Sequence, residues 1–193
     1  KYPVSKAYLT KTGFADDFQA DLVHHGGVNK ALFLFSSITY EKISSSFDNS
    51  FDMANMAFFG ENLILDKICE KDICVGDILK IGQAKVQITQ PRQPCWKLSA
   101  NSLKNSMTKF IFETGLTGFY AKVLKEGQIS HNDDVVLEQR TNPNLTIEKL
   151  NQIIVEPKID INLTKEALAC EDLGHQFKNS LTKRYELGDE DNQ

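Results

Sequence analysis

Residues 79–98 read LKIGQAKVQITQPRQPCWKL, and this stretch decides how the chain folds. Apolar and polar side chains alternate on either side of the dipeptide at 82–83. Alternation of this kind around a two-residue turn is typical of a β-hairpin. We therefore predict two antiparallel strands from which Lys80, Lys85 and Gln87 face outward, with a loop that follows directly from the second strand.

The loop after this hairpin carries a cysteine, Cys95, in a setting that suggests chemistry. Pro91 and Pro94 each fix their own φ and push the preceding residue toward extended geometry, which predicts a pre-organised, non-helical segment. The cations Arg92 and Lys97 both favour the thiolate, the form that attacks electrophiles and binds soft metals. The alternative is a cysteine that packs as a small hydrophobic residue beside the neighbouring tryptophan.

Composition places the chain among ordinary globular proteins. With 193 residues, of which 41% are hydrophobic, it can bury a substantial core in one main domain with a small appendage. A net charge of −4 argues against direct nucleic-acid binding and against binding to anionic membranes, because both need a basic surface. No run of 18 apolar residues occurs, and residues 1–6 lack the apolar core of a signal peptide, which favours a cytoplasmic location.

The cysteines are too sparse for a structural framework. Four occur in 193 residues, and none forms a CxxC pair. Neither a disulfide framework nor a structural zinc site is indicated. The four are Cys69, Cys74, Cys95 and Cys170.

Further elements follow from the same patterns. Residues 119–129 alternate around Glu126-Gly127 and predict a second hairpin, and residues 135–137 predict one more strand. Between the two hairpins, residues 107–113 predict a short helix that ends at Gly115, a residue suited to the left-handed position after a helix.

Beyond Asn142-Pro143 the pattern becomes helical. Thr146 is a plausible N-cap for a first helix, and Thr164 can cap a second. Apolar residues then recur every four positions from Leu173 to Tyr185 and predict a third.

Three short helices cannot bury a core alone, so they are expected to pack on another unit. We divide the chain into a strand domain, residues 1–142, and a small helical appendage, residues 143–188. The appendage packs either on the strand domain or on a second subunit, which makes a homodimer possible.

A second candidate site is the segment HHGGVNK at 24–30. The paired glycines Gly26 and Gly27 let successive amide groups converge on an anion that His25 and Lys30 can also meet. The spacing is not that of a P-loop. The alternative is a glycine turn with a solvated lysine and hydrogen-bonded histidines.

A third candidate is FFGENL at 58–63, in which Gly60 leads a turn. Glu61 can accept two parallel N–H bonds from an amidine-like ring edge, such as that of a pterin or guanine, and Asn62 can both donate and accept. The alternative is a turn in which Glu61 caps nearby backbone amides. The histidines have no metal-ligand partners at close spacing, and no GxSxG, HExxH or GxGxxG motif occurs.

Five segments taken in order resemble a MOSC domain, the domain named after the carboxyl-terminal part of molybdenum-cofactor sulfurases. They are HHGGVNKAL at 24–32, FGENL at 59–63, VGDILKIG at 75–82, QPRQPCWKL at 90–98 and TGLTGFYAKVL at 114–124. The helical segment is similar to the three-helix tail of the bacterial YiiM-type branch of this family. The resemblance implies a mainly β fold, with a β-barrel core, short helices and a small helical appendage.

The resemblance also implies a cofactor and the residues that hold it. The family binds molybdenum cofactor (molybdopterin), a pterin that carries a dithiolene-bound metal and a phosphate. By position, Cys95 corresponds to the cysteine thought to ligate molybdenum or to carry sulfur. The residues that match the polar surroundings of the cofactor are His25, Gly26, Gly27, Lys30, Gly60, Glu61, Asn62 and Arg92.

Three functions remain open on this basis. In the first, the chain is a molybdenum-cofactor oxidoreductase that reduces N-hydroxylated compounds, such as N-hydroxylated purine bases. Its electrons would come from a separate donor protein, because the sequence shows no flavin or iron–sulfur signature. In the second, the chain only carries cofactor or sulfur, with a persulfide on Cys95. In the third, it is an interaction module whose tail mediates dimerisation.

Overall fold

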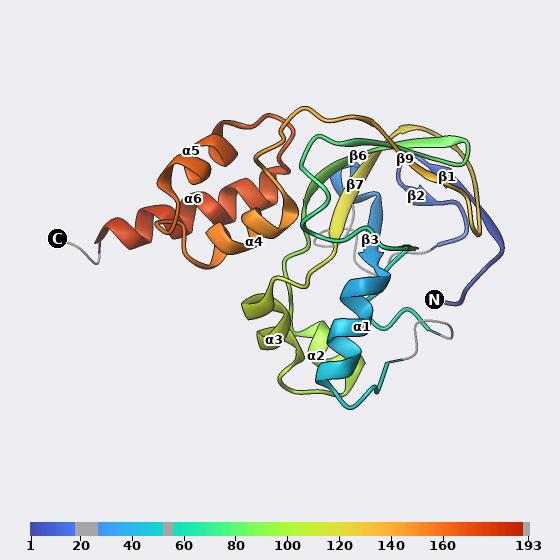
Figure 1. Cartoon of the computed structure of the whole chain (residues 1–193), viewed down its shortest axis with the longest axis horizontal. Coiled ribbons are helices and arrows are strands. Elements are labelled where there is room, and N and C mark those ends of the chain that lie inside the picture. Colours follow the sequence, from blue (N-terminus) through green and yellow to red (C-terminus); the bar gives the residue numbers. More distant parts are fainter. Residues whose placement is uncertain (18–26, 52–55, 191–193) are drawn as a thin grey trace.

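Two sheets and a helical tail make up the protein. The structure is a computed structural model, and it describes the backbone of residues 1–17, 27–51 and 56–190. In Figure 1 the strands form the body of the molecule, the helices α4, α5 and α6 lie together on one side of it, and α1, α2 and α3 lie below.

The larger sheet is mixed and has the strand order β4-β3-β7-β6-β5-β9. Only its β3–β4 pair is parallel. The sheet curls into a half-barrel with short helices around it, which confirms the predicted mainly β fold (Figure 1). Its strands are β3 (Leu32–Ser36), β4 (Leu63–Leu65), β5 (Ile78–Ile81), β6 (Ala84–Pro91), β7 (Phe119–Lys125) and β9 (Val135–Gln139). The smaller sheet, ordered β2-β1-β8, consists of β1 (Lys6–Thr10), β2 (Gly13–Phe14) and β8 (Gly127–Ser130).

The predicted first hairpin is confirmed, with one correction. Strands β5 and β6 pair antiparallel, with Ile81 opposite Ala84 across the turn at 82–83. Lys80 is exposed, as expected. The prediction was wrong for Gln87, which is only 9% exposed. Its amide donates to the Gly76 carbonyl (3.3 Å) and to Asp172 Oδ1 (3.0 Å), so a tertiary partner from the tail satisfies this polar side chain in a buried position.

The predicted second hairpin was wrong, although both of its strands exist. Strand β7 pairs with β3 and β6, whereas β8 pairs with β1 in the other sheet. Glu126 alone separates them, which is one residue fewer than the shortest common hairpin turn. A Cβ on Gly127 would lie 2.7 Å from the carbonyl carbon of Gln83, so this glycine permits a close backbone approach. The chain therefore crosses to the second sheet. The predicted strand at 135–137 is confirmed as part of β9.

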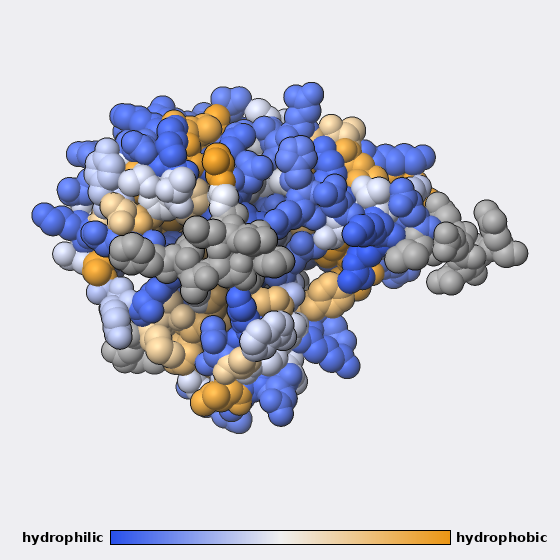
Figure 2. All heavy atoms as spheres, turned by 180° about the vertical axis from the view of Figure 1, so that it is seen from behind, coloured by the Kyte–Doolittle hydropathy of each residue, from blue (hydrophilic) through white to orange (hydrophobic). Residues whose placement is uncertain are grey.

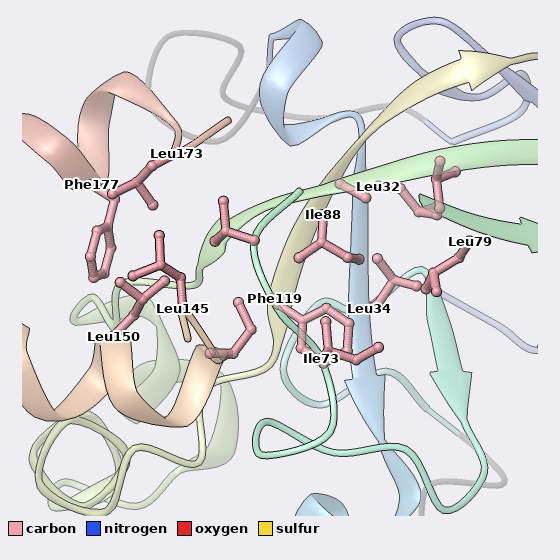
Figure 3. Packing of buried hydrophobic residues seen from close by; sticks show 14 of the residues in the cluster. Leu32, Leu34, Ile73, Leu79, Ile88, Phe119, Leu145, Leu150, Leu173 and Phe177 are labelled. Atoms are coloured by element: carbon pink, nitrogen blue, oxygen red, sulfur yellow. The ribbon is translucent and has the colours of Figure 1, made fainter. Parts of the chain in front are cut away.

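Strands β3 and β7 are buried on both faces, and the two faces differ in chemistry. On one face, alternate residues such as Leu34 and Phe119 join the main core, whose buried members include Leu32, Leu34, Ile73, Leu79, Ile88, Phe119, Leu145, Leu150, Leu173 and Phe177 (Figure 3). On the other face, Phe33 and Tyr120 join an aromatic cluster near α1, α2 and α3. The buried members of this aromatic cluster are Phe33, Phe35, Tyr40, Ile43, Phe51, Phe59, Leu98, Met107, Ile111 and Tyr120.

The tail shares its core with the strands. Leu150 and Phe177 of the tail belong to the same buried cluster as Ile88 and Phe119 of the sheet, and Figure 3 shows them facing this cluster. The expected packing on the strand domain is therefore seen. The division of the chain at residue 142 stays a prediction, as does contact with a second subunit. The tail helices are α4 (Ile147–Val155), α5 (Ile161–Ala169) and α6 (His175–Glu190).

One of the two predicted caps in the tail is confirmed. Thr146 Oγ1 accepts a hydrogen bond from the Lys149 amide (3.1 Å) at the start of α4. The prediction for Thr164 was wrong, because Asp160 caps α5 by accepting from the Leu163 amide (2.9 Å). Thr164 lies inside that helix, is fully buried, and donates to the Pro157 carbonyl (2.7 Å).

Four further helical segments lie outside the tail in the described part of the chain. Helix α3 ends at Gly115, whose φ of 70° confirms the predicted left-handed terminus. None of the helices in the described ranges is long and apolar enough to cross a membrane. Figure 2 shows a surface on which hydrophilic residues predominate and hydrophobic residues occur in small groups. The four segments are the 3-10 helix η1 (Val28–Lys30), α1 (Ser37–Ser46), α2 (Lys97–Ser102) and α3 (Met107–Thr114).

Candidate functional site

The cysteine loop, residues 92–95, runs between the end of β6 and the start of α2. It has no regular secondary structure, as predicted, and it is fixed at both ends. The Arg92 amide donates to the Gly118 carbonyl (3.1 Å), which extends the β6–β7 contact past the strand. At the other end, Thr108 Oγ1 donates to the Cys95 carbonyl (3.0 Å). The loop is therefore held between strand β7 and helix α3.

Cys95 differs from the other cysteines in exposure. It is half-buried, whereas Cys69, Cys74 and Cys170 are buried. Burial raises the pKa of each of those three thiols. Trp96, 71% exposed, does not cover the neighbouring sulfur as a core residue would. These observations favour a reactive cysteine over the alternative of a packed hydrophobic residue.

Arg92 is the first residue of this loop, and its side chain is buried. Its side chain is only 7% exposed, its guanidinium carbon lies 5.5 Å from the Phe33 ring centre, and it hydrogen-bonds to Tyr120. The Nη1 atom has no hydrogen-bond partner among the described residues. Burial lowers the pKa of Arg92, and interactions with Tyr120, Cys95 and Glu61 oppose that shift. The guanidinium is therefore near enough to interact electrostatically with the Cys95 thiol and with the Glu61 carboxyl group.

Glu61 is the carboxyl group in question. It follows Gly60, which adopts a φ of 84° that other residues rarely accept. Glu61 is 5% exposed, and its Oε2 accepts from the Phe59 amide (3.1 Å), as the capping alternative predicted. Its Oε1 is buried without a hydrogen-bond partner in the described ranges. Burial raises the pKa of this carboxyl, while backbone hydrogen bonds, Lys1 and Arg92 lower it to a smaller extent.

Asn62 attaches this turn to the sheet. The Asn62 side-chain oxygen Oδ1 accepts a hydrogen bond from the Phe33 backbone amide (3.0 Å). The Asn62 backbone amide donates to the Phe33 carbonyl (2.8 Å). The Nδ2 atom donates to Asp17 Oδ2 (2.7 Å). The visible role of Asn62 is thus to position Glu61 beside β3, and direct contact with a ligand stays a prediction.

Lys30, at the end of η1, lies near Tyr120 and Arg92. Its Nζ donates to Gln176 Oε1 of α6 and lies 5.4 Å from the centre of the Tyr120 ring. Burial and the nearby Arg92 lower the pKa of Lys30. The Asn29 carbonyl accepts from Thr89 Oγ1 (2.7 Å), which holds this segment against β6.

The glycine segment is described only in part. Gly27 precedes η1 with a φ of 101°, and its carbonyl accepts from the Lys30 amide (2.9 Å). His25 and Gly26 lie outside the described residues. Convergence of the paired glycine amides on an anion therefore stays a prediction.

Three site residues were missed from the sequence. Tyr120 lies opposite Gln90 in the β6–β7 pair, and Gln90 Nε2 is buried without a hydrogen-bond partner in the parts of the chain that are described. Gln90 Oε1 lies 2.0 Å from where a Cβ on Gly174 would stand, so the tail packs closely against it. The alternation of β7 could have placed Tyr120 on the face opposite Phe119. No pattern indicates that Gln176 reaches Lys30.

These side chains form a polar cradle, consisting of Lys30, Glu61, Gln90, Arg92 and Tyr120. It contains the three buried side-chain polar atoms that lack hydrogen bonds among the described residues. Leaving one such atom unsatisfied costs about 1–3 kcal/mol, so their presence around the cysteine loop makes this place the candidate binding site. Within the described ranges, no group of three or more His, Cys, Asp and Glu residues could hold a metal ion.

The fold and the polar cradle define a half-barrel in which a half-buried cysteine lies beside a group of buried polar side chains. The model of the MOSC domain family matches residues 21–136, more than half of the chain. The chain belongs to the MOSC domain family, as its sequence motifs predicted.

Related proteins span nearly the whole chain. It is 32% identical to the uncharacterized protein YflK of Bacillus subtilis over 93% of this chain and 80% of YflK. It is 27% identical to the protein YiiM of Escherichia coli over 91% of this chain and 78% of that protein. The crystal structure of YiiM from Geobacillus stearothermophilus superposes with a TM-score of 0.80 at 30% identity and covers 94% of this chain and 86% of that one. A protein named as a reductase in Gibberella moniliformis is 26% identical, but the match covers only 34% of its length.

Proposed function

We propose that the protein binds molybdenum cofactor (molybdopterin) through Cys95 and the polar cradle, and that it reduces N-hydroxylated compounds such as N-hydroxylated purine bases. The observation that carries this proposal is the grouping of unpaired buried polar atoms beside a half-exposed cysteine. Membership of the MOSC family and a relative named as a reductase support it.

The residues present fit such a cofactor. A thiolate at Cys95 is a soft ligand suited to molybdenum. Arg92 and Lys30 offer positive charge to the anionic phosphate and dithiolene, and Arg92 Nη1 is a ready donor. Glu61 Oε1 can face the amidine-like edge of the pterin. Burial raises the pKa of this carboxyl group above its ordinary value.

The cofactor would supply the redox-active metal, and the chain would supply its orientation and protons. Conversion of an N–OH group to N–H consumes two electrons and two protons and releases water. The electrons would come from a separate donor protein, in the cytoplasm. Tyr120, whose pKa is raised by burial, stays protonated beside Arg92 and is a further hydrogen-bond donor in the cradle.

The first experiment measures the cofactor. The chain is purified from a host supplied with molybdate, and molybdenum and pterin are quantified per chain. We expect stoichiometric metal in the wild type and in Cys69→Ser, the buried control, and loss of the metal in Cys95→Ser. Absence of metal from the wild type, or its retention in Cys95→Ser, contradicts the proposal.

A second experiment separates the enzyme from a carrier. The metal-loaded chain is mixed with an N-hydroxylated purine base and an artificial electron donor, and the reduced base is measured. Turnover identifies the enzyme. The half-exposed Cys95 thiol also suits a persulfide, so a persulfide found there by mass spectrometry without turnover identifies a sulfur carrier.

A further inference from the structure

A cleft of about 240 Å³ lies between the cysteine loop and the helical tail. Arg92 borders it from the loop and Phe112 from α3, while Asn151, Phe177 and Arg184 border it from the tail. Because two parts of the chain far apart in sequence form its walls, the cleft exists only in the folded molecule. It adjoins the polar cradle through Arg92, which contributes to both.

The polar lining of the cleft favours a negative charge. Arg92 is buried, and its Nη1 has no hydrogen-bond partner in the part of the chain that the structure describes. The Arg184 guanidinium carbon lies 5.1 Å from the centre of the Phe112 ring. No Asp or Glu occurs among the described residues that line the cleft. Arginine is well suited to bind carboxylate or phosphate through two parallel bonds. Since the whole chain carries a net charge of −4, an anion would be attracted locally and not by the overall field.

The remaining lining and the volume favour a small ring. Phe112 is partly exposed and provides apolar surface, and the buried side chains of Ile154 and Phe177 lie behind the cleft wall. Asn151 Nδ2 donates to the Gly115 carbonyl (2.8 Å) and to Thr117 Oγ1 (2.9 Å), so this wall is held in position. A cavity of about 150 Å³ accommodates a benzene ring, whereas pockets for drug-sized molecules exceed about 300 Å³. The cleft therefore suits one ring or two fused rings.

We propose that this cleft binds a small aromatic molecule with a negative charge, its ring against Phe112 and its charge toward Arg184 and Arg92. Because Arg92 also interacts electrostatically with Cys95, the bound molecule lies one side chain away from the proposed metal ligand. The inference rests on the proposed function only where it takes the bound aromatic anion to be the substrate of the reductase. Binding itself is independent of that function.

The test compares benzoate with its neutral isostere, benzamide, by ligand-observed NMR on the full chain without added metal. We expect benzoate to bind about tenfold more tightly, as one charge-assisted pair would give. Arg184→Gln should abolish this preference, and Arg184→Lys should retain part of it. The matched control is Lys183→Gln, which removes one positive charge from the exposed residue just before Arg184. It should leave the preference for benzoate over benzamide intact.

Three outcomes overturn the inference: no binding of benzoate, equal binding of the two probes to the wild type, or equal effects of Arg184→Gln and Lys183→Gln. A second measurement separates this result from the proposed function. With metal-loaded chain and a carboxylated aromatic N-hydroxylated substrate, Arg184→Gln should raise KM about tenfold and leave kcat unchanged. Benzoate binding without metal uptake would uphold the cleft and refute the enzyme. Turnover that neither benzoate nor Arg184→Gln affects would uphold the enzyme and refute the cleft as its substrate site.

Discussion

Two buried carboxyl groups, Asp77 and Glu61, show how differently the two sides of this molecule are built. Asp77, fully buried near the joint between sheet and tail, accepts from Arg140 Nε (2.9 Å), from Arg140 Nη2 (2.7 Å) and from the Cys74 amide (2.8 Å). Glu61, in the cradle, accepts from one backbone amide and leaves Oε1 unpaired. The first carboxylate is satisfied by the fold, whereas one oxygen of the second has no hydrogen-bond partner among the described residues.

The difference extends beyond these two groups. Near Asp77, buried polar side chains such as Gln87 have protein partners. Among the described residues, the three buried side-chain atoms without a hydrogen-bond partner belong to Glu61, Gln90 and Arg92 of the cradle. Because an unsatisfied buried polar atom costs stability, the fold retains these atoms at a cost that ligand binding would recover. The two regions thus differ in how fully the fold satisfies their buried polar atoms.

The largest expected effect comes from disrupting the satisfied carboxylate. Asp77→Asn should lower the free energy of unfolding by about 2–3 kcal/mol, because the new amide would place a donor against the donors of Arg140. Arg140 is partly solvated, which keeps the loss below that of a fully buried pair. The measurement is urea-induced unfolding. Glu113→Gln, at an exposed carboxylate on α3, is the control and should change stability by less than about 0.5 kcal/mol. Similar losses in both variants would contradict the comparison.

A smaller effect of opposite sign is expected at Glu61. Its pKa is raised in the folded state, so the ionised form destabilises the fold as pH rises above the ordinary value of 4.5. Glu61→Gln should therefore be more stable than the wild type at pH 7 to 8, by about 1 kcal/mol, and this advantage should shrink toward pH 4. Thermal unfolding of both proteins across that pH range tests the prediction. A wild type that is the more stable protein at pH 8, or a difference independent of pH, would refute it.

The smallest change is alkylation of single cysteines, which compares the two regions in the intact fold. At pH 7, Cys95 should be alkylated faster than Cys69, Cys74 or Cys170, because it is half-exposed while burial raises the pKa of the other thiols. Mass spectrometry of peptides after brief iodoacetamide treatment measures the four rates. Equal, slow alkylation at all four positions would show that the cysteine loop is closed.

Several predictions from sequence depended on local rules, and these were confirmed. The hairpin at 79–88 follows from period-two alternation around a two-residue turn, and the helix that ends at Gly115 follows from the need for a left-handed residue there. The two prolines of the cysteine loop predicted its non-helical course. Ordered motifs, together with Cys95, predicted the family.

What the sequence by itself determined was the local geometry of each segment and the chemistry of the residues that the motifs carry. Only the tertiary structure placed β7 and β8 in different sheets, because the route after Glu126 depends on a close approach between Gly127 and Gln83. It also decided that Gln176 contacts Lys30 and that Arg184 borders a cleft with Arg92. Such contacts join residues separated by many turns of chain, and their formation depends on packing free energy summed over the whole core, which no short pattern contains.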